Sequence, residues 1–341
     1  MYILENVPLS TYSTMRLGGT AAWLTEVQNR NDINQAVAWA KARNLPFITI
    51  GTGSNVVWQD DGYPGLVIIN RIGGIDVDDS DSSFRYVTAG AGVVWDELVA
   101  HTVAGGMSGL ENLSLIPGTV GATPVQNVGA YGSEVSSVIL TIEAYDTTTS
   151  QFVVLRAGDC EFGYRTSRFK TTDKGRFIIS SVTFFLNLSP PTPPYYTAVE
   201  DYLKQNNITT PSVNDIRTAV IAIRSAKLPD PATYPNNGSF FANPIISDDQ
   251  LRELADNYPE IVYWNVDGQT SKLSAAWLID QAGFKDFHDT ETGMSTWHLQ
   301  PLVLVNEHAE TSTQLIVFRD KIIAAVENKF GVRLEQEPEL I

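Results

Sequence analysis

The N-terminal part of the chain alternates a stretch of helical periodicity with short apolar runs. Residues 33–40 place apolar side chains on one helix face, and Asn31-Asp32 is expected to cap that helix. The runs at 46–50 and 66–69 predict short buried strands. Between them, Gly51-Thr52-Gly53-Ser54-Asn55 predicts a tight polar loop directly after a strand.

The middle of the chain is rich in strands, with one helix expected at 94–103 that turns Val94, Leu98 and Val99 inward. The segment 111–134 has no regular period and many glycines and prolines. An irregular segment of this length inside a compact domain is usually functional. The expected strands cover 84–90, 138–145, 152–155 and 177–186.

Helical periodicity dominates the C-terminal third. Apolar positions at helical spacing predict helices around 213–223, 251–254 and 277–279, and a long last helix over 311–330. The pattern therefore predicts a β-rich N-terminal half, a break near 190–228 and a smaller α/β half.

Composition narrows the class of protein. The chain has 341 residues, 43% of them hydrophobic, and a net charge of −16, which indicates a globular protein and argues against a general nucleic-acid or anionic-membrane binder. A single cysteine, Cys160, and the lack of a signal-like or membrane-spanning stretch favour a cytoplasmic protein. The four histidines and one cysteine lack metal-ligand spacing, so no metal site is expected.

Three segments carry candidate chemistry. The glycines of 51–55 let backbone N–H groups approach phosphates, although most such runs are plain turns. Residues 116–132 suit either the wall of a large planar cofactor or a structural Ω-loop. Residues 156–176 hold six basic side chains in an acidic protein, which suggests an anion site or a solvated face. The position of Ser239 between a glycine and two aromatic residues could hold it nearly dry, but no nucleophile elbow surrounds it.

Taken together, these segments resemble the UDP-N-acetylenolpyruvoylglucosamine reductase (UDP-N-acetylmuramate dehydrogenase) family, in its long form with a tyrosine loop. The resemblance runs from about Tyr12 to Ile341 and includes seven blocks in the family's order. They are Gly51–Asn55, Ile116–Gly132, Phe162–Lys170, Lys227–Pro231, Gly238–Pro244, Lys272–Asp280 and Leu302–Asn306.

The resemblance implies an α+β fold, with a two-part FAD-binding domain of the PCMH (vanillyl-alcohol-oxidase-like) type and a smaller α/β substrate-binding domain. The implied boundaries are 1–70 and 71–228 for the two FAD-binding subdomains, with a substrate loop at 189–200, and 229–330 for the substrate domain. Residues 331–341 are expected to return near the active site.

The implied activity is that of a flavoenzyme of peptidoglycan synthesis, and hence of cell-wall biogenesis, cell shape and cell division. NADPH would reduce FAD, and the flavin would reduce UDP-N-acetylglucosamine enolpyruvate to UDP-N-acetylmuramate. A monomer without nucleic-acid partners or membrane insertion is expected.

The resemblance also implies roles for individual residues. Arg165 would stabilise an enolate-like state, Ser239 would donate the proton, and Glu337, with Glu335 or Glu339 as alternatives, would assist with a raised pKa. Tyr196, or alternatively Tyr195, matches the loop tyrosine. The remaining implied substrate residues are Tyr164, Lys227, Asn243, Trp264, Lys272 and Gln300. The implied cofactor residues are Gly51, Thr52, Gly53, Ser54, Asn55, Ile116, Pro117, Gly118, Gly121, Ala122, Gln126, Asn127, Gly129, Ala130, Tyr131 and Arg224.

Two other readings remain open. An FAD-dependent oxidase or dehydrogenase of different substrate would share the cofactor domain, but the blocks after residue 220 speak against it. A catalytically silent nucleotide-sugar binding protein would have lost Arg165, Ser239 or Glu337, and the chain keeps all three.

Overall fold

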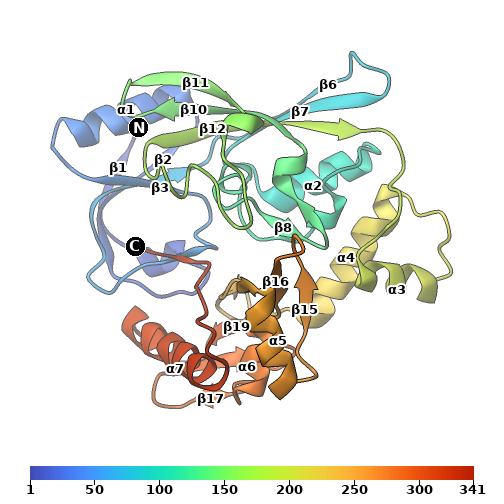
Figure 1. The fold of residues 1–341 in the computed structure, drawn as a ribbon. Helices are drawn as coiled ribbons and strands as arrows, with labels where there is room; N and C mark the ends of the chain where they lie inside the picture. The colour runs from blue at the N-terminus through green and yellow to red at the C-terminus, as the bar shows by residue number, and fades with distance from the viewer. The chain divides into compact units, whose positions relative to one another are not determined.

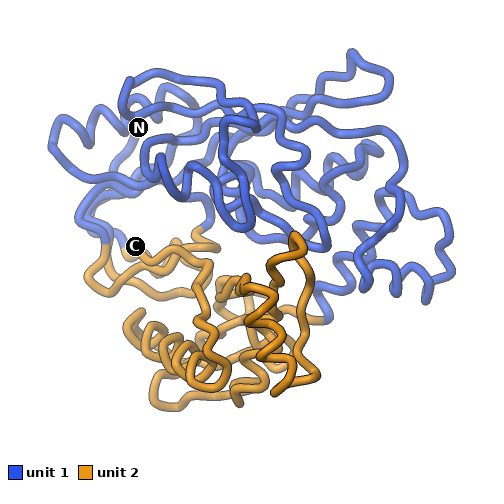
Figure 2. The backbone as a smooth tube through the Cα atoms, in the orientation of Figure 1, with its two compact units in different colours: residues 1–7, 21–52, 63–226 blue, residues 8–20, 53–62, 227–341 orange.

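The structure of the protein is a computed structural model that describes residues 1–341, and it divides into two compact units (Figure 2). Unit 1 comprises residues 1–7, 21–52 and 63–226. Unit 2 comprises residues 8–20, 53–62 and 227–341. Two short N-terminal segments thus pack with the C-terminal third of the chain, which the sequence did not suggest. The expected boundary at residue 70 stays a prediction.

The first sheet of unit 1 is built on parallel strands joined by a helix (Figure 1). Its order is β1 (Ile3–Pro8), β2 (Thr20–Val27), β5 (Tyr63–Asn70), β3 (Phe47–Ile50). Helix α1 (Arg30–Lys41) connects β2 to β3 and buries Ile33, Ala36, Val37 and Ala40, as its periodicity predicts. The predicted cap was wrong by two residues, because the side chain of Asn29 accepts from the N–H of Asp32.

The second sheet of unit 1 is antiparallel, with the order β11 (Gln151–Arg156), β10 (Ile139–Asp146), β12 (Phe177–Asn187), β7 (Phe84–Gly90), β6 (Ile75–Asp78). Helix α2 (Trp95–Ala104) packs Leu98 and Val99 into the core of this sheet. Val94 was expected to be buried but precedes the helix as its N-cap and is exposed, since Trp95 takes the inward position.

The irregular segment at 111–134 contains no long element. It consists of the 3₁₀ turns Glu111–Leu113 and Val120–Ala122 and the two-residue strands β8 (Gly129–Ala130) and β9 (Ser133–Glu134). Helices α3 (Thr197–Gln205) and α4 (Val213–Lys227) complete unit 1 and share a small apolar core that includes Val199, Ile216 and Val220.

Unit 2 surrounds one apolar core with three helices, two small sheets and the two-stranded pair of β20 (Glu339–Leu340) and β4 (Val56–Val57). One sheet has the order β13 (Asn236–Ser239), β19 (Gln300–Asn306), β18 (Met294–Trp297), β17 (His288–Asp289). The other has the order β14 (Ile245–Ser247), β16 (Thr270–Leu273), β15 (Tyr263–Asn265). The helices are α5 (Asp248–Asn257), α6 (Ala275–Gln281) and α7 (Ser312–Phe330).

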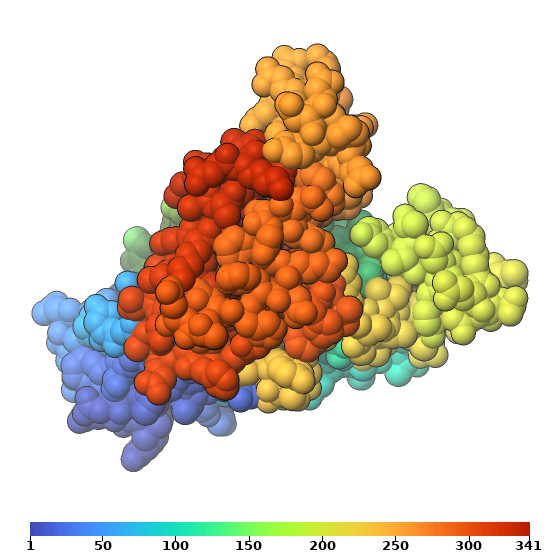
Figure 3. All heavy atoms as spheres, turned by 90° about the horizontal axis from the view of Figure 1, so that it is seen from below, coloured from blue at the N-terminus to red at the C-terminus, as the bar shows by residue number.

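The C-terminal residues run along the surface of unit 2, in red in Figure 3. Strand β20 (Glu339–Leu340) pairs in parallel with β4 (Val56–Val57), so the end of the chain lies beside the residues that follow the Gly51–Asn55 loop. None of the helices combines the length and the apolar character needed to cross a bilayer.

Candidate active site

The loop 51–55 is shaped by close contacts with the side chain of Thr119 and the backbone of Tyr12. A Cβ on Gly51 would lie 2.3 Å from the hydroxyl oxygen of Thr119, so this loop and the 116–132 segment touch inside unit 1. Gly53 has a positive φ of 71°, and a Cβ there would lie 2.0 Å from the carbonyl oxygen of Tyr12 in unit 2. Steric overlap with other atoms of the protein therefore disfavours any side chain at these two positions, whether or not a ligand is bound.

The 116–132 segment is held in an unusual backbone path. Gly118, Asn127, Tyr131 and Gly132 all have positive φ. A Cβ on Gly121 would lie 2.6 Å from the Cβ of Ala91, which presses the segment against the second sheet. The long irregular stretch thus forms a wall that is tightly packed at Gly121 and Gly129, where a side chain larger than glycine would not fit.

Asn127 is fully buried within this wall. Its amide nitrogen donates to a carboxylate oxygen of Glu134 at 2.8 Å and to the carbonyl oxygen of Gly163 at 3.0 Å. Its amide oxygen accepts from the N–H of Ser136 at 3.1 Å. The side chain was predicted to bind the cofactor, but its two N–H groups are already used by the protein.

Arg165 stands at the tip of a four-residue turn. The backbone groups of Gly163 and Thr166 bond to each other in both directions, at 3.1 and 3.2 Å. Arg165 itself has φ of 54°, a left-handed conformation that is strained for a residue with a side chain. Its guanidinium donates to the carbonyl oxygen of Gly129 at 2.8 Å. The predicted catalytic arginine therefore lies against the 116–132 segment, which we call the flavin wall.

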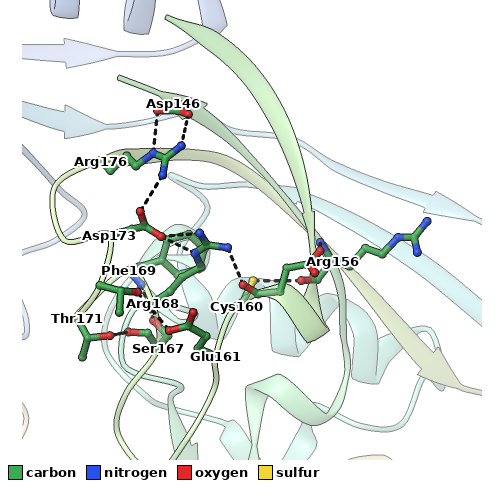
Figure 4. A network of polar contacts seen from close by, with 12 residues as sticks. Asp146, Arg156, Cys160, Glu161, Ser167, Arg168, Phe169, Thr171, Asp173 and Arg176 are labelled. Atoms are coloured by element: carbon green, nitrogen blue, oxygen red, sulfur yellow. Dashed lines mark hydrogen bonds and ion pairs between the residues drawn. The ribbon is translucent and has the colours of Figure 1, made fainter. Parts of the chain in front are cut away.

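Two of the six basic residues at 156–176 are not available for a ligand (Figure 4). Arg168 donates to Asp173 and to the carbonyl oxygen of Asp159. Arg176 donates through two nitrogens to Asp146, at 3.1 and 2.8 Å, and also to Asp173. The interpretation of the whole cluster as an anion site is wrong for these two, because buried or half-buried carboxylates already neutralise them.

Tyr131 contacts two other predicted ligand-binding residues of unit 1, Arg224 and Tyr196. The guanidinium of Arg224 hydrogen-bonds to its phenol oxygen, and the ring of Tyr196 meets it edge-on at 5.4 Å between centroids. Burial raises the pKa of the Tyr131 phenol, although Arg224 acts against this. Burial lowers the pKa of the Arg224 guanidinium, although Tyr131 and Asp96 oppose the change. Tyr195, the alternative to Tyr196, uses its hydroxyl to donate to the carbonyl oxygen of Pro191.

Ser239 lies at the end of β13 in unit 2. A turn presents it, because the side-chain oxygen of Asn236 accepts from the N–H of Gly238, whose φ is 70°. The following residues, Phe240 and Phe241, are both buried. Ser239 itself is exposed, so the chain alone does not keep it nearly dry.

The C-terminal tail approaches the same turn. The N–H of Glu337 donates to the carbonyl oxygen of Phe240 at 2.9 Å, and the N–H of Ala242 donates to the carbonyl oxygen of Glu335. The amide of Asn55 donates to the carbonyl oxygen of Glu337 at 3.4 Å. Unit 2 therefore brings together Ser239, Glu337 and the end of the first predicted cofactor loop.

The implied nucleotide-sugar residues of unit 2 fall into two groups. On the β14–β16–β15 sheet, the ammonium of Lys272 lies 5.8 Å from the ring centre of exposed Trp264. Asn243, just before β14, accepts from the N–H of Ala275 at the start of α6. Lys227 and Gln300 lie elsewhere in the unit, where the indole of Trp297 donates to the carbonyl oxygen of Lys227 and Gln300 pairs with Trp297.

Some contributing residues were missed at the level of sequence. Thr119 packs its side chain on Gly51. Asn237 is buried and donates to the carbonyl oxygens of Ser54 and Val56 and to the hydroxyl of Thr14. The Asn236-Asn237-Gly238 run is a recognisable turn signal, but its partners at 14 and 54–56 are far away in sequence.

The residues of unit 1 fit a dinucleotide cofactor with a pyrophosphate. The hydroxyl oxygen of Thr52 is buried without a hydrogen-bond partner, and it is a suitable donor to a phosphate oxygen. Arg224 is a half-buried cation in the same unit. A tight wall of small residues beside these groups matches a large planar ring system. We therefore regard Thr52, Arg224 and the 116–132 wall as the residues that would hold FAD.

Comparison with known proteins agrees with this. Residues 21–155 match an FAD binding domain, and residues 230–341 match the C-terminal domain of UDP-N-acetylenolpyruvoylglucosamine reductase. The fold and site thus define an FAD-dependent oxidoreductase with a PCMH-type cofactor domain and a second, smaller domain.

Relatives extend the match over the whole chain. The UDP-N-acetylenolpyruvoylglucosamine reductase of Ralstonia nicotianae is 41% identical, over 98% of both chains, and that of Xylella fastidiosa is 38% identical, over 98% of this chain and 95% of the relative. The chain belongs to the UDP-N-acetylenolpyruvoylglucosamine reductase family. The solved reductase of Thermus caldophilus shares the fold, with a TM-score of 0.68, 23% identity and 99% coverage of both chains.

Proposed function

We propose that the protein reduces the enolpyruvyl ether of UDP-N-acetylglucosamine enolpyruvate to UDP-N-acetylmuramate, with NADPH as reductant, in peptidoglycan precursor synthesis. The full-length identity of 41% to a reductase of this name carries the proposal. We further propose that the protein works as a monomer in the cytoplasm, with no nucleic acid bound.

FAD, when bound, supplies the hydride carrier between NADPH and the sugar substrate. The enolpyruvyl group is a vinyl ether conjugated to a carboxylate, so addition of hydride at the methylene carbon moves electron density toward the carboxylate. Arg165 stabilises that charge, because a guanidinium stays ionised and binds a carboxylate through two nitrogens. Its left-handed turn and its bond to Gly129 support this role, since they fix the side chain beside the flavin wall.

Ser239 completes the reduction by donating a proton to the carbon that bears the ether oxygen. A new C–H bond forms at each carbon of the double bond, one from hydride and one from the hydroxyl proton, and the electron pair of the π bond is consumed. A serine is a weak acid, so a neighbouring cation must stabilise its alkoxide until solvent returns the proton. The exposure of Ser239 supports this role, since the hydroxyl remains accessible to substrate and solvent.

Each unit, taken by itself, carries proposed ligands of the nucleotide sugar. Tyr196 is favoured over Tyr195 as the loop tyrosine, because Tyr195 already donates its hydroxyl to Pro191. Lys272 and Trp264 present a cation and an aromatic face together. Lys227, Asn243, Gln300 and Tyr164 remain proposed substrate ligands.

The proposal is tested with the purified holoenzyme. NADPH oxidation must depend on the enolpyruvyl sugar, and the product must be UDP-N-acetylmuramate by mass. Oxidation of NADPH without any consumption of the sugar would instead indicate an FAD-dependent oxidase that uses oxygen.

A further inference from the structure

The turn that carries Arg165 is attached to the flavin wall at three points inside unit 1. The guanidinium of Arg165 reaches Gly129, and the hydroxyl of Ser167 donates to the carbonyl oxygen of Val125 at 2.6 Å. The third attachment is the bond from the amide of Asn127 to the carbonyl oxygen of Gly163. The wall therefore bonds to the base of the turn on both sides, as well as to its tip.

The packing at Gly129 shows how close the guanidinium of Arg165 lies to the backbone of the flavin wall. A Cβ on Gly129 would lie 3.0 Å from a guanidinium nitrogen of Arg165 and 2.9 Å from the carbonyl oxygen of Ser133. The guanidinium thus occupies the space that a side chain at 129 would take. A left-handed arginine persists only where its surroundings determine it, because such a conformation costs about 1 kcal/mol or more.

The part of the same loop that follows Arg165 is also held in place, by ion pairs. Arg168, three residues after Arg165, is held by Asp173, which in turn binds Arg176 and through it Asp146 at the end of β10 (Figure 4). This chain of ion pairs anchors the loop to the second sheet but leaves the direction of the turn tip open. The bonds at the turn itself are those of Asn127 and Ser167 and the one from the ammonium of Lys170 to the carbonyl oxygen of Arg165 at 3.4 Å.

Asn127 has the one functional group that suits this position. It donates two N–H groups, one to the Glu134 carboxylate and one to the Gly163 carbonyl, and accepts from the N–H of Ser136 through its oxygen. A carboxylate in its place could accept from Ser136 but would face two further acceptors without a proton. Leaving buried acceptors unpaired in this way is costly.

We propose that Asn127 is a positioning residue that links the flavin wall to the Gly163–Thr166 turn and so aims the guanidinium of Arg165. The effect of this aim on catalysis rests on the proposed function. The link itself is a property of the chain and exists without cofactor or substrate.

Asn127→Asp tests the link in the apoprotein. The amides of Gly163 and Thr166, which bond to each other's carbonyl groups, should exchange with deuterium about tenfold faster than in the wild type. Asn70→Asp is the matched control. Asn70 is also buried, and its side chain likewise donates to a carbonyl, that of Ile179, and accepts from an N–H, that of Ile72. The control should not change exchange at the turn, and equal exchange in wild type and Asn127→Asp overturns the proposal.

Half-reactions of the holoenzyme provide the second readout. Asn127→Asp should slow reoxidation of reduced flavin by the enolpyruvyl sugar about 100-fold, since misplacement of a catalytic group by about 1 Å has an effect of that size. Reduction by NADPH should stay near the wild-type rate. Adding Glu134→Gln restores a donor to the 127–134 pair but none to Gly163, so reoxidation should remain slow in the double variant.

Two further results would support or overturn the positioning role of Asn127. If Asn127→Asp fails to fold, Ser167→Ala, which removes the bond to Val125, should give the same local loss of amide protection. A variant that loses protection but reoxidises at the wild-type rate overturns the inference, because the aim of Arg165 would then be irrelevant. Failure of the proposed function is recognised separately, since the wild type itself would not pass electrons to the sugar.

Discussion

The N–H of Glu337 donates to the carbonyl oxygen of Phe240 at 2.9 Å. This bond joins the tail of the chain to the residue directly after Ser239, across almost 100 positions of sequence. Isolated bridging between Phe241 and Gln336 continues the contact. The proposed proton donor and the proposed C-terminal carboxylate therefore belong to one rigid part of unit 2.

Ser239→Ala should separate the two half-reactions. Reduction of the flavin by NADPH needs no proton at the substrate carbon and should remain near the wild-type rate. Reoxidation by the enolpyruvyl sugar should fall by about 10²–10⁴-fold, the usual contribution of general acid catalysis. Stopped-flow flavin absorbance measures both steps. Ser239→Cys should be partly active, and equal slowing of both steps would assign Ser239 a structural role.

Glu337→Gln should slow reoxidation by about 10²-fold if its carboxyl group stabilises charge in the transition state. Glu335→Gln is the control, because Glu335 is exposed and contributes its backbone carbonyl, which accepts from Ala242. The substitution leaves that carbonyl in place and should have little effect. A larger loss in Glu335→Gln or in Glu339→Gln would move the role to that residue.

Gly53→Val should give unstable, flavin-poor protein. The new Cβ would overlap the carbonyl oxygen of Tyr12, and a β-branched residue at φ of 71° is strongly strained. Flavin absorbance per protein and the thermal midpoint are the measurements. Gly73→Val is the matched control, because a Cβ at Gly73 meets no atom within 4 Å. Full flavin occupancy in Gly53→Val would count against the loop's role.

Tyr196→Phe should raise the apparent KM for the nucleotide sugar and leave reduction by NADPH unchanged. The phenylalanine keeps the edge-on ring contact with Tyr131, so the change isolates the hydroxyl group. Steady-state kinetics with varied sugar concentration provide the test. Tyr195→Phe should leave this KM unaltered, and the reverse pattern would reassign the loop tyrosine.

Asp146→Asn should lower the free energy of unfolding of unit 1. It should also make that free energy depend less on pH in acid. Hydrogen bonds from Arg176 hold the pKa of the Asp146 carboxyl well below its usual range. A lowered folded pKa contributes stability that is present above the unfolded value near 4 and lost as the pH falls below it. Urea unfolding should show about 2 kcal/mol less stability at pH 7, and a smaller further loss between about pH 4 and 2. Asp76→Asn, on the exposed face of β6, is the control and should retain the wild-type acid response.

Much of the fold follows from periodicity. The inward face of α1, the long last helix α7 and the strand at 84–90 were predicted correctly, because 3.6-residue and two-residue repeats are local properties of the chain. The seven blocks at 51–55, 116–132 and beyond were enough to indicate the family. The local patterns indicated the wrong residue at two positions. Trp95 faces inward in place of Val94, and Asn29 caps α1 in place of Asn31-Asp32.

The sequence by itself determined the periodicity of the helices and strands, and its motif blocks, through their resemblance to the reductase family, indicated the α+β class, the FAD-dependent chemistry and the candidate residues, since periodicity and motifs depend on residue types at short spacing. The tertiary structure decided which of those residues are available. It showed that Arg168 and Arg176 are neutralised by carboxylates, that Asn127 is bonded on all sides by the chain, and that Glu337 lies beside the Ser239 turn. Such partners are separated by up to about a hundred residues, and only the packed backbone brings their polar groups within hydrogen-bonding distance.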